Sequence, residues 1–179
     1  MMNQIALGRY RTARIWQEEL PNAGFDPIDV LSYESRSDVN LSSNRKQAFC
    51  IEYRAHLGGR IAYGLLGSTL RDTQSGAESV HVLSNDQDCR IFQTDLSFPG
   101  DRILIGLPAI FASSVLSSAK NYISEHTGLH GWGRLTFHCA AFSEFGSSQH
   151  VFEQLAAVNC HYYFAQNPID EVKLNSLLH

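Results

Sequence analysis

The fold is decided by residues 48–66, which read AFCIEYRAHLGGRIAYGLL. Both halves of this stretch are rich in β-branched, aromatic and other apolar residues, a composition typical of β-strands. The paired glycines Gly58 and Gly59 separate the two halves, and glycine adopts backbone angles that other residues resist. The stretch therefore predicts a β-hairpin, with one strand before the glycines and one after them.

Further short segments on both sides of this hairpin predict the rest of a sheet, because they contain strand-forming residues and are bounded by turn formers. They are residues 28–33, 80–83, 89–94 and 131–140.

Two helices follow from apolar residues that recur at steps of three and four. The first is predicted over residues 107–126, and the second begins near residues 146–148, with a serine as its N-cap. Each helix has one apolar stripe, so each can pack on one face of a sheet. The sequence therefore predicts an α+β fold, a two-layer sandwich in which two helices cover one face of a mostly antiparallel sheet.

The chain has 179 residues, of which 44% are hydrophobic. This length favours a single domain that buries its core without disulfides or metal. Turn-forming residues gather at 21–27, so we expect an N-terminal arm at 1–27, a domain at 28–165 and a C-terminal tail at 166–179.

The net charge of −4 is mild and excludes neither an RNA nor a protein partner. Arg9, Arg11 and Arg14 form the tightest basic cluster, and the simplest interpretation is a solvated face of the arm. No apolar run has the length of a membrane span, and residues 1–11 lack the apolar segment of a secretory signal. We therefore expect a cytoplasmic protein without a membrane partner.

The four cysteines are far apart in the sequence and form no metal-binding pair. They are Cys50, Cys89, Cys139 and Cys160. Buried, reduced thiols in a cytoplasmic protein explain this spacing best, although the even number also permits two disulfides.

No pattern of catalytic residues stands out. Residues 64–69, Gly-Leu-Leu-Gly-Ser-Thr, lack the lysine and the spacing of a phosphate-binding loop, and the chain has no Gly-x-Ser-x-Gly sequence. His126 and His130 have a spacing that can bind metal on a helix, but Gly128 interrupts that helix and no third ligand joins them. We therefore expect a protein that is not an enzyme and holds no cofactor or metal.

Three segments, in order, resemble domain IV of translation elongation factor G and of the tetracycline-resistance ribosomal protection proteins. Residues 30–35, Val-Leu-Ser-Tyr-Glu-Ser, are similar to the family's first strand, and residues 58–64 match Gly-Gly-Arg-Gly-Gln-Tyr-Gly at five of seven positions. The sequence Gly-Leu-His-Gly-Trp at 128–132 resembles Gly-Leu-Tyr-Gly-Trp of the protection proteins. Residues 146–156 are similar to the family's Asp-Ser-Ser-x-x-x-Phe-x-x-Ala-Ala.

This resemblance implies a fold of the ribosomal protein S5 domain 2 type, and two tip loops that bind the ribosome or a structured RNA. By resemblance, the loops consist of His56, Leu57, Gly58, Gly59, Arg60, Ile61 and Ala62, and of Ser143, Glu144, Phe145, Gly146 and Ser147. Arg60 suits phosphate, and the rings of His56 and Phe145 suit stacking on bases.

The chain departs from the family at the second loop. Ser143 replaces the family's histidine and Gly146 replaces its aspartate. At the first loop, Arg54-Ala55-His56-Leu57 stands where the family has a Lys/Gln-rich approach, so the tip as a whole is less basic. The family's nucleotide-binding domain is absent from these residues, so the resemblance implies no GTP hydrolysis.

Two other functions stay open. The mild acidity and the arm at 1–27 favour a protein-interaction module on the same scaffold, such as an inhibitor, an immunity protein or an accessory protein. An enzyme has the least support, because a fold alone does not carry an activity.

Overall fold

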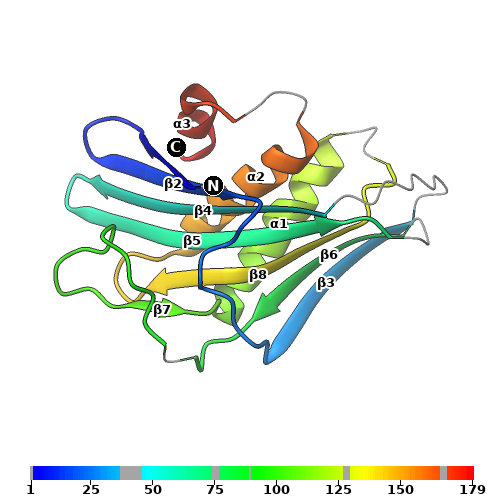
Figure 1. Cartoon of the computed structure of the whole chain (residues 1–179), viewed down its shortest axis with the longest axis horizontal. Coiled ribbons are helices and arrows are strands. Elements are labelled where there is room, and N and C mark those ends of the chain that lie inside the picture. Colours follow the sequence, from blue (N-terminus) through cyan, green and yellow to red (C-terminus); the bar gives the residue numbers. More distant parts are fainter. Residues whose placement is uncertain (1, 37–45, 74–76, 89, 127–129, 166–168) are drawn as a thin grey trace.

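The computed structural model describes residues 2–36, 46–73, 77–88, 90–126, 130–165 and 169–179. These residues form a mixed α+β fold, which consists of an open sheet and three helices (Figure 1). The strands are β1 (Met2–Ala6), β2 (Arg11–Gln17), β3 (Asp29–Arg36), β4 (Lys46–Leu57), β5 (Arg60–Arg71), β6 (Ala77–Ser84), β7 (Ile103–Ile105) and β8 (Arg134–Ser143). The helices are α1 (Ala109–Glu125), α2 (Gln149–Phe164) and α3 (Glu171–Leu177).

The described strands form one 8-stranded sheet in the order β1-β2-β4-β5-β8-β6-β3, and β7 pairs with a further part of β8. Neighbouring strands run antiparallel, except for β6 and β8, which are parallel. Parallel neighbours need a crossover connection, and α1 lies in the connection between these two strands. The prediction of a mostly antiparallel sheet is confirmed.

The hairpin predicted at residues 48–66 is confirmed as β4 and β5. Leu57 pairs with Arg60, so Gly58 and Gly59 are the two central residues of the turn. Their φ angles are 57° and 87°, both in the left-handed region. A two-residue hairpin turn of this kind needs positive φ at both positions, which explains the pair of glycines.

Helices α1 and α2 cover one face of the sheet (Figure 1). Phe49 and Ile51 of β4 are buried in the same cluster as Phe152 and Leu155 of α2. Gly64 of β5 lets α2 approach closely, since a Cβ atom there would lie 2.8 Å from Leu155 Cδ1. The expected helices, and their packing on one face, are therefore confirmed.

The opposite face of the sheet holds a second, smaller apolar cluster. It contains Cys50 and Leu65 from the strands, and Ala23 and Leu96 from two covering segments, residues 18–28 and 90–102. The first of these segments crosses the sheet in front of the strands in Figure 1. Both faces of the central strands are therefore covered, although only one is covered by helices.

Three cysteines are buried and free, as predicted, while Cys89 lies outside the described residues. They are Cys50, Cys139 and Cys160. Burial raises the pKa of the Cys50 and Cys160 thiols.

Residues 1–27 do not form the separate arm that the sequence predicted. Strands β1 and β2 extend the sheet beyond β4, and the alternation along β2 turns Ala13 and Ile15 into the helix-covered core. The C-terminal residues are also more ordered than the predicted tail, because α3 buries Leu174, and Leu178 follows it into the core.

The strand predicted at residues 89–94 is wrong where the structure describes it. Residues 90–94 form a loop whose only pairing there is an isolated bridge between Ile91 and Leu104. Strand β7, which the sequence did not predict, pairs with β8 instead. Among the described helices, none has the length and apolar character that a membrane crossing needs.

Candidate functional site

The two loops singled out by the sequence lie side by side at one end of the sheet. The backbone N–H of Tyr63, at the start of β5, donates to the Gly146 carbonyl at 3.0 Å. The Ser147 hydroxyl donates to the Tyr63 carbonyl at 2.7 Å. A Cβ atom on Gly146 would lie 2.9 Å from Ile61 Cγ2, so this glycine permits the close contact of the two loops.

Hydrogen bonds within the second loop turn Phe145 outward. The hydroxyl oxygen of Ser143 accepts from the N–H groups of Phe145 and Gly146, at 3.1 and 2.6 Å, and donates to Asp101 Oδ2 at 2.5 Å. The Ser143 N–H donates to the Ser147 hydroxyl oxygen at 2.9 Å. The backbone is thereby fixed, while the Phe145 side chain is 77% exposed.

A pocket of about 890 Å³ opens between the loops and the first turns of α2. Its walls come from both predicted loops, from β4, from α2 and from the last two residues of the sequence. They are Tyr53, Gly59, Arg60, Ile61, Ala62, Phe145, Gly146, Ser147, Ser148, His150, Val151, Gln154, Leu178 and His179. This volume falls within the usual range for small-molecule sites.

Four of the predicted loop residues whose side chains the structure describes do not line this pocket. Ser143 is buried, Glu144 and Gly58 are exposed outside the lining of the pocket, and the side chain of Leu57 lies outside the described part. His56 is directed to the loop at 90–102, where its ring lies 5.9 Å from the Phe98 ring, centroid to centroid. The other seven residues of the two predicted loops line the pocket, and their predicted role in binding stays a prediction.

Other pocket residues were missed by the sequence analysis. His150 and Gln154 lie one turn apart on α2, shortly after the predicted serine cap. Residues at this spacing share one face of a helix, and this pattern could have indicated from the sequence that both side chains line the same site. Leu178 and His179 carry no such signal. They are held by tertiary contacts, since Arg11 Nη2 donates to the Leu178 carbonyl at 3.3 Å and Gln154 Nε2 donates to the His179 carbonyl at 2.7 Å.

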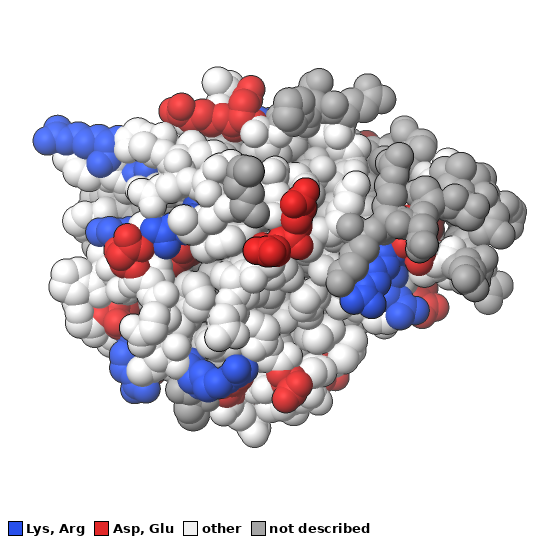
Figure 2. All heavy atoms as spheres, in the orientation of Figure 1, with Lys and Arg blue, Asp and Glu red and all other residues white. Residues whose placement is uncertain are grey.

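The described lining of the pocket contains a basic side chain and no acidic one. None of the described residues that line it is aspartate or glutamate, whereas Arg60 is exposed at its edge. The first turn of α2 has no acidic residue, so the positive end of the helix dipole is not neutralised there. On the opposite face of the molecule, Figure 2 shows basic and acidic side chains lying beside one another at the end that carries the β1–β2 and β4–β5 turns.

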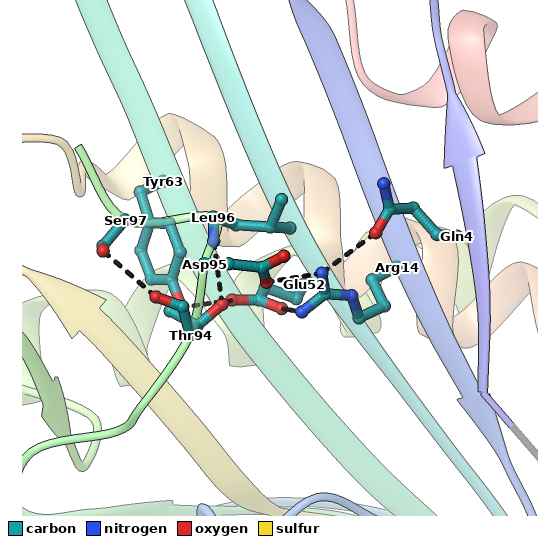
Figure 3. A network of polar contacts seen from close by, with 8 residues as sticks. All are labelled: Gln4, Arg14, Glu52, Tyr63, Thr94, Asp95, Leu96 and Ser97. Atoms are coloured by element: carbon teal, nitrogen blue, oxygen red, sulfur yellow. Dashed lines mark hydrogen bonds and ion pairs between the residues drawn. The ribbon is translucent and has the colours of Figure 1, made fainter.

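A buried carboxylate lies on the other face of the sheet, close to the same end (Figure 3). Glu52 has no exposed surface. Its Oε1 accepts from the hydroxyls of Tyr63 and Thr94, at 2.8 and 2.6 Å, and its Oε2 lies 3.3 Å from Arg14 Nη1. Burial raises the pKa of Glu52, while the hydrogen bonds and the Arg14 charge oppose this change.

Arg14 extends this network to the loop above the sheet. Its Nη2 donates to Asp95 Oδ1 at 2.7 Å and to Gln4 Oε1 at 2.9 Å. The hydrogen bond from Arg14 lowers the pKa of Asp95. The sequence predicted that Arg14 lies on a solvated face, but only 9% of its surface is exposed. It is buried because it lies opposite Glu52 in the β2–β4 pair.

The network fastens a loop to the sheet. Burial raises the pKa of Tyr63, so its hydroxyl stays protonated and donates to the carboxylate. The Thr94 hydroxyl oxygen also accepts from the Leu96 N–H at 3.1 Å. Glu52, Thr94 and Arg14 therefore fasten residues 94–97 to the sheet, next to the strands that form the tip.

A second basic group lies at the other end of β5. Arg71 and Arg134 are paired across β5 and β8, and both line a shallow pocket of about 450 Å³. Asp26 also lines this pocket and reduces its positive charge. Both ends of β5 therefore carry an exposed arginine, which allows a matched comparison between them.

The described residues contain no group of three or more histidine, cysteine, aspartate or glutamate side chains that could hold a metal ion. No family model, no curated protein and no solved structure matches this chain. The resemblance to domain IV of elongation factor G therefore rests on the sequence motifs alone.

Proposed function

We propose that this chain is a non-catalytic protein similar to domain IV of elongation factor G, and that it binds the ribosome or another structured RNA. The contact surface is formed by the paired loops at residues 56–62 and 143–147. The observation that carries this proposal is their shared pocket, which has Arg60 and Phe145 at its edge and no acidic side chain among its described lining residues.

The element order supports the resemblance. Strands β4, β5 and β6 are followed by the three-residue strand β7 and then by α1, β8 and α2, and α1 and α2 pack on one face of the sheet. This order is consistent with the ribosomal protein S5 domain 2 type of fold, which the sequence motifs imply.

The chemistry of the two loops also suits RNA. Arginine binds phosphate through a planar fork of donors, and an exposed aromatic ring can stack on a base. The glycines Gly58 and Gly59 leave the tip of the hairpin without side chains, so a polynucleotide backbone can approach closely. The most direct experiment therefore replaces Arg60 and leaves the glycines and the rest of the loop unchanged.

Ribosome co-sedimentation and binding to labelled ribosomal RNA fragments test the proposal at several salt concentrations. Replacing Arg60 with alanine should weaken binding and reduce the slope of log affinity against log salt by about 1, because one phosphate contact is lost. Arg71→Ala is the matched control, since Arg71 is exposed at the opposite end of the same strand. No binding by the wild-type protein, or equal losses in both variants, would contradict the proposal.

A protein-interaction module is the second candidate. It is favoured by the 77% exposure of Phe145 and by the outer strand β3, whose Val30 is 45% exposed, since unpaired strand edges can bind another chain. A stoichiometric protein partner that stays bound after nuclease treatment, and is lost in Phe145→Ala, would favour this candidate over RNA.

A further inference from the structure

The pocket between the loops is larger than a phosphate contact requires. Its volume of about 890 Å³ can accept a whole ring system together with its sugar. It also has a floor, because Tyr53 lies beneath it with only 1% exposure and its hydroxyl lies 3.5 Å from the Leu178 carbonyl. The site is therefore a built concavity rather than a flat contact surface.

Aromatic side chains surround this concavity. Phe145 and His150 belong to its exposed edge, and Tyr53 and His179 complete the set of rings. The Phe145 ring is 77% exposed on a loop fixed by hydrogen bonds, so it is available to stack on a planar ligand. Bases provide such partners without regard to sequence, because every base has a π-face.

The pocket also has polar side chains that can bind the phosphate and the base of a nucleotide. The Arg60 guanidinium at the edge can bind a phosphate, and the Ser148 and Gln154 side chains line the interior, where they can hydrogen-bond to the edge of a base. Since no aspartate or glutamate is among the described lining residues, an anionic ligand meets no side-chain repulsion inside the pocket.

We infer that this pocket takes up one unpaired nucleotide of the bound RNA, with its base beside Phe145 and its phosphate at Arg60. The inference rests on the proposed function, and it narrows the RNA to one with a bulged or looped-out nucleotide. A base in a continuous double helix is stacked on both sides and cannot enter a pocket, whereas a bulged base is free to do so.

Two RNA hairpins provide the test, one fully paired and one identical except for a single bulged adenosine. Fluorescence anisotropy at a fixed salt concentration gives both dissociation constants. We expect the wild-type protein to bind the bulged hairpin about tenfold more tightly, which is the size of one base–aromatic stacking contact.

Variants of Phe145 separate this inference from the proposed function. Phe145→Ala should abolish the preference, so that both hairpins bind with the same affinity, while Phe145→Tyr should retain the preference. Val172→Ala is the control, because Val172 of α3 is also 77% exposed but does not line the pocket.

Each outcome decides one of the two claims. If the wild-type protein binds neither hairpin nor the ribosome, the proposed function fails and the inference fails with it. If it binds both hairpins equally, or if Phe145→Ala weakens both equally, the inference is overturned and the proposed function stands. A pocket that binds only a protein partner would overturn both.

Discussion

The Ser147 hydroxyl donates a hydrogen bond of 2.7 Å to the carbonyl oxygen of Tyr63. This contact joins the loop before α2 to the strand that follows the glycine turn. Ser147 also accepts from the Ser143 N–H, so one side chain fixes both the shape of its own loop and its position beside β5. Several properties of the tip depend on contacts of this kind.

Ser147→Ala should lower the free energy of unfolding by about 1–3 kcal/mol, because the Tyr63 carbonyl and the Ser143 N–H both lose a hydrogen-bond partner in a partly buried place. Urea unfolding followed by circular dichroism measures this change. Ser113→Ala, on the exposed side of α1, should change stability by less than about 0.5 kcal/mol. Similar values for the two variants would show that the Ser147 bonds do not stabilise the fold.

The close approach at Gly146 gives a second prediction. Gly146→Ala places a Cβ atom 2.9 Å from Ile61 Cγ2, and we expect a loss of about 1–3 kcal/mol from overpacking. Adding Ile61→Ala removes the opposing atoms, so the double variant should be more stable than the sum of the single effects predicts. Strict additivity in this double-mutant cycle would contradict the contact.

The buried ion pair predicts a larger effect. Arg14→Leu leaves the Glu52 carboxylate, which has no exposed surface, without its cation, and breaking a buried pair in this way costs about 3–5 kcal/mol. Arg9→Leu is the control from the same basic cluster, since Arg9 is exposed and should have little effect. Thermal unfolding at neutral pH compares the two, and a mild effect of Arg14→Leu would show that the pair contributes little.

Glu52 should also make stability depend on pH. Burial raises its pKa above the reference value of 4.5, so the folded state binds this proton more tightly than the unfolded state does. The resulting stability is fully present below the unfolded pKa and is lost as the pH rises through the folded pKa. Relative to Glu52→Gln, the wild-type protein should therefore lose stability over this range as the pH rises, as urea titrations at several pH values can measure.

Asp95 provides the control of opposite sign. The hydrogen bond from Arg14 lowers its pKa below 3.8, so its contribution is present above the unfolded pKa and is lost as the pH falls through the folded pKa. Relative to Asp95→Asn, the wild-type protein should lose stability on acidification. If the two variants gave differences of the same sign, the assignment of the pKa directions would be incorrect.

Several secondary-structure elements could be predicted from the sequence, because they depend on the properties of neighbouring residues. Gly58 and Gly59 predicted the hairpin turn, because its positive φ angles are a property of those two residues alone. The serines within residues 146–148 predicted the start of α2, and the structure shows that the cap is Ser148, whose side chain accepts from the Val151 N–H at 3.3 Å. The two loops that line part of the pocket were singled out by their resemblance to domain IV of elongation factor G, and each lies beside one of these local signals.

Tertiary structure decided which of these elements meet. Arg14 and Glu52 are 38 residues apart in the chain, and nothing in the sequence around either residue indicates that they form an ion pair. The strand order, the incorporation of residues 2–17 into the sheet and the wall formed by Leu178 and His179 likewise have no local signal. They depend on which surfaces can be buried together over long separations in the chain, and this is a property of the whole packed molecule rather than of any one segment.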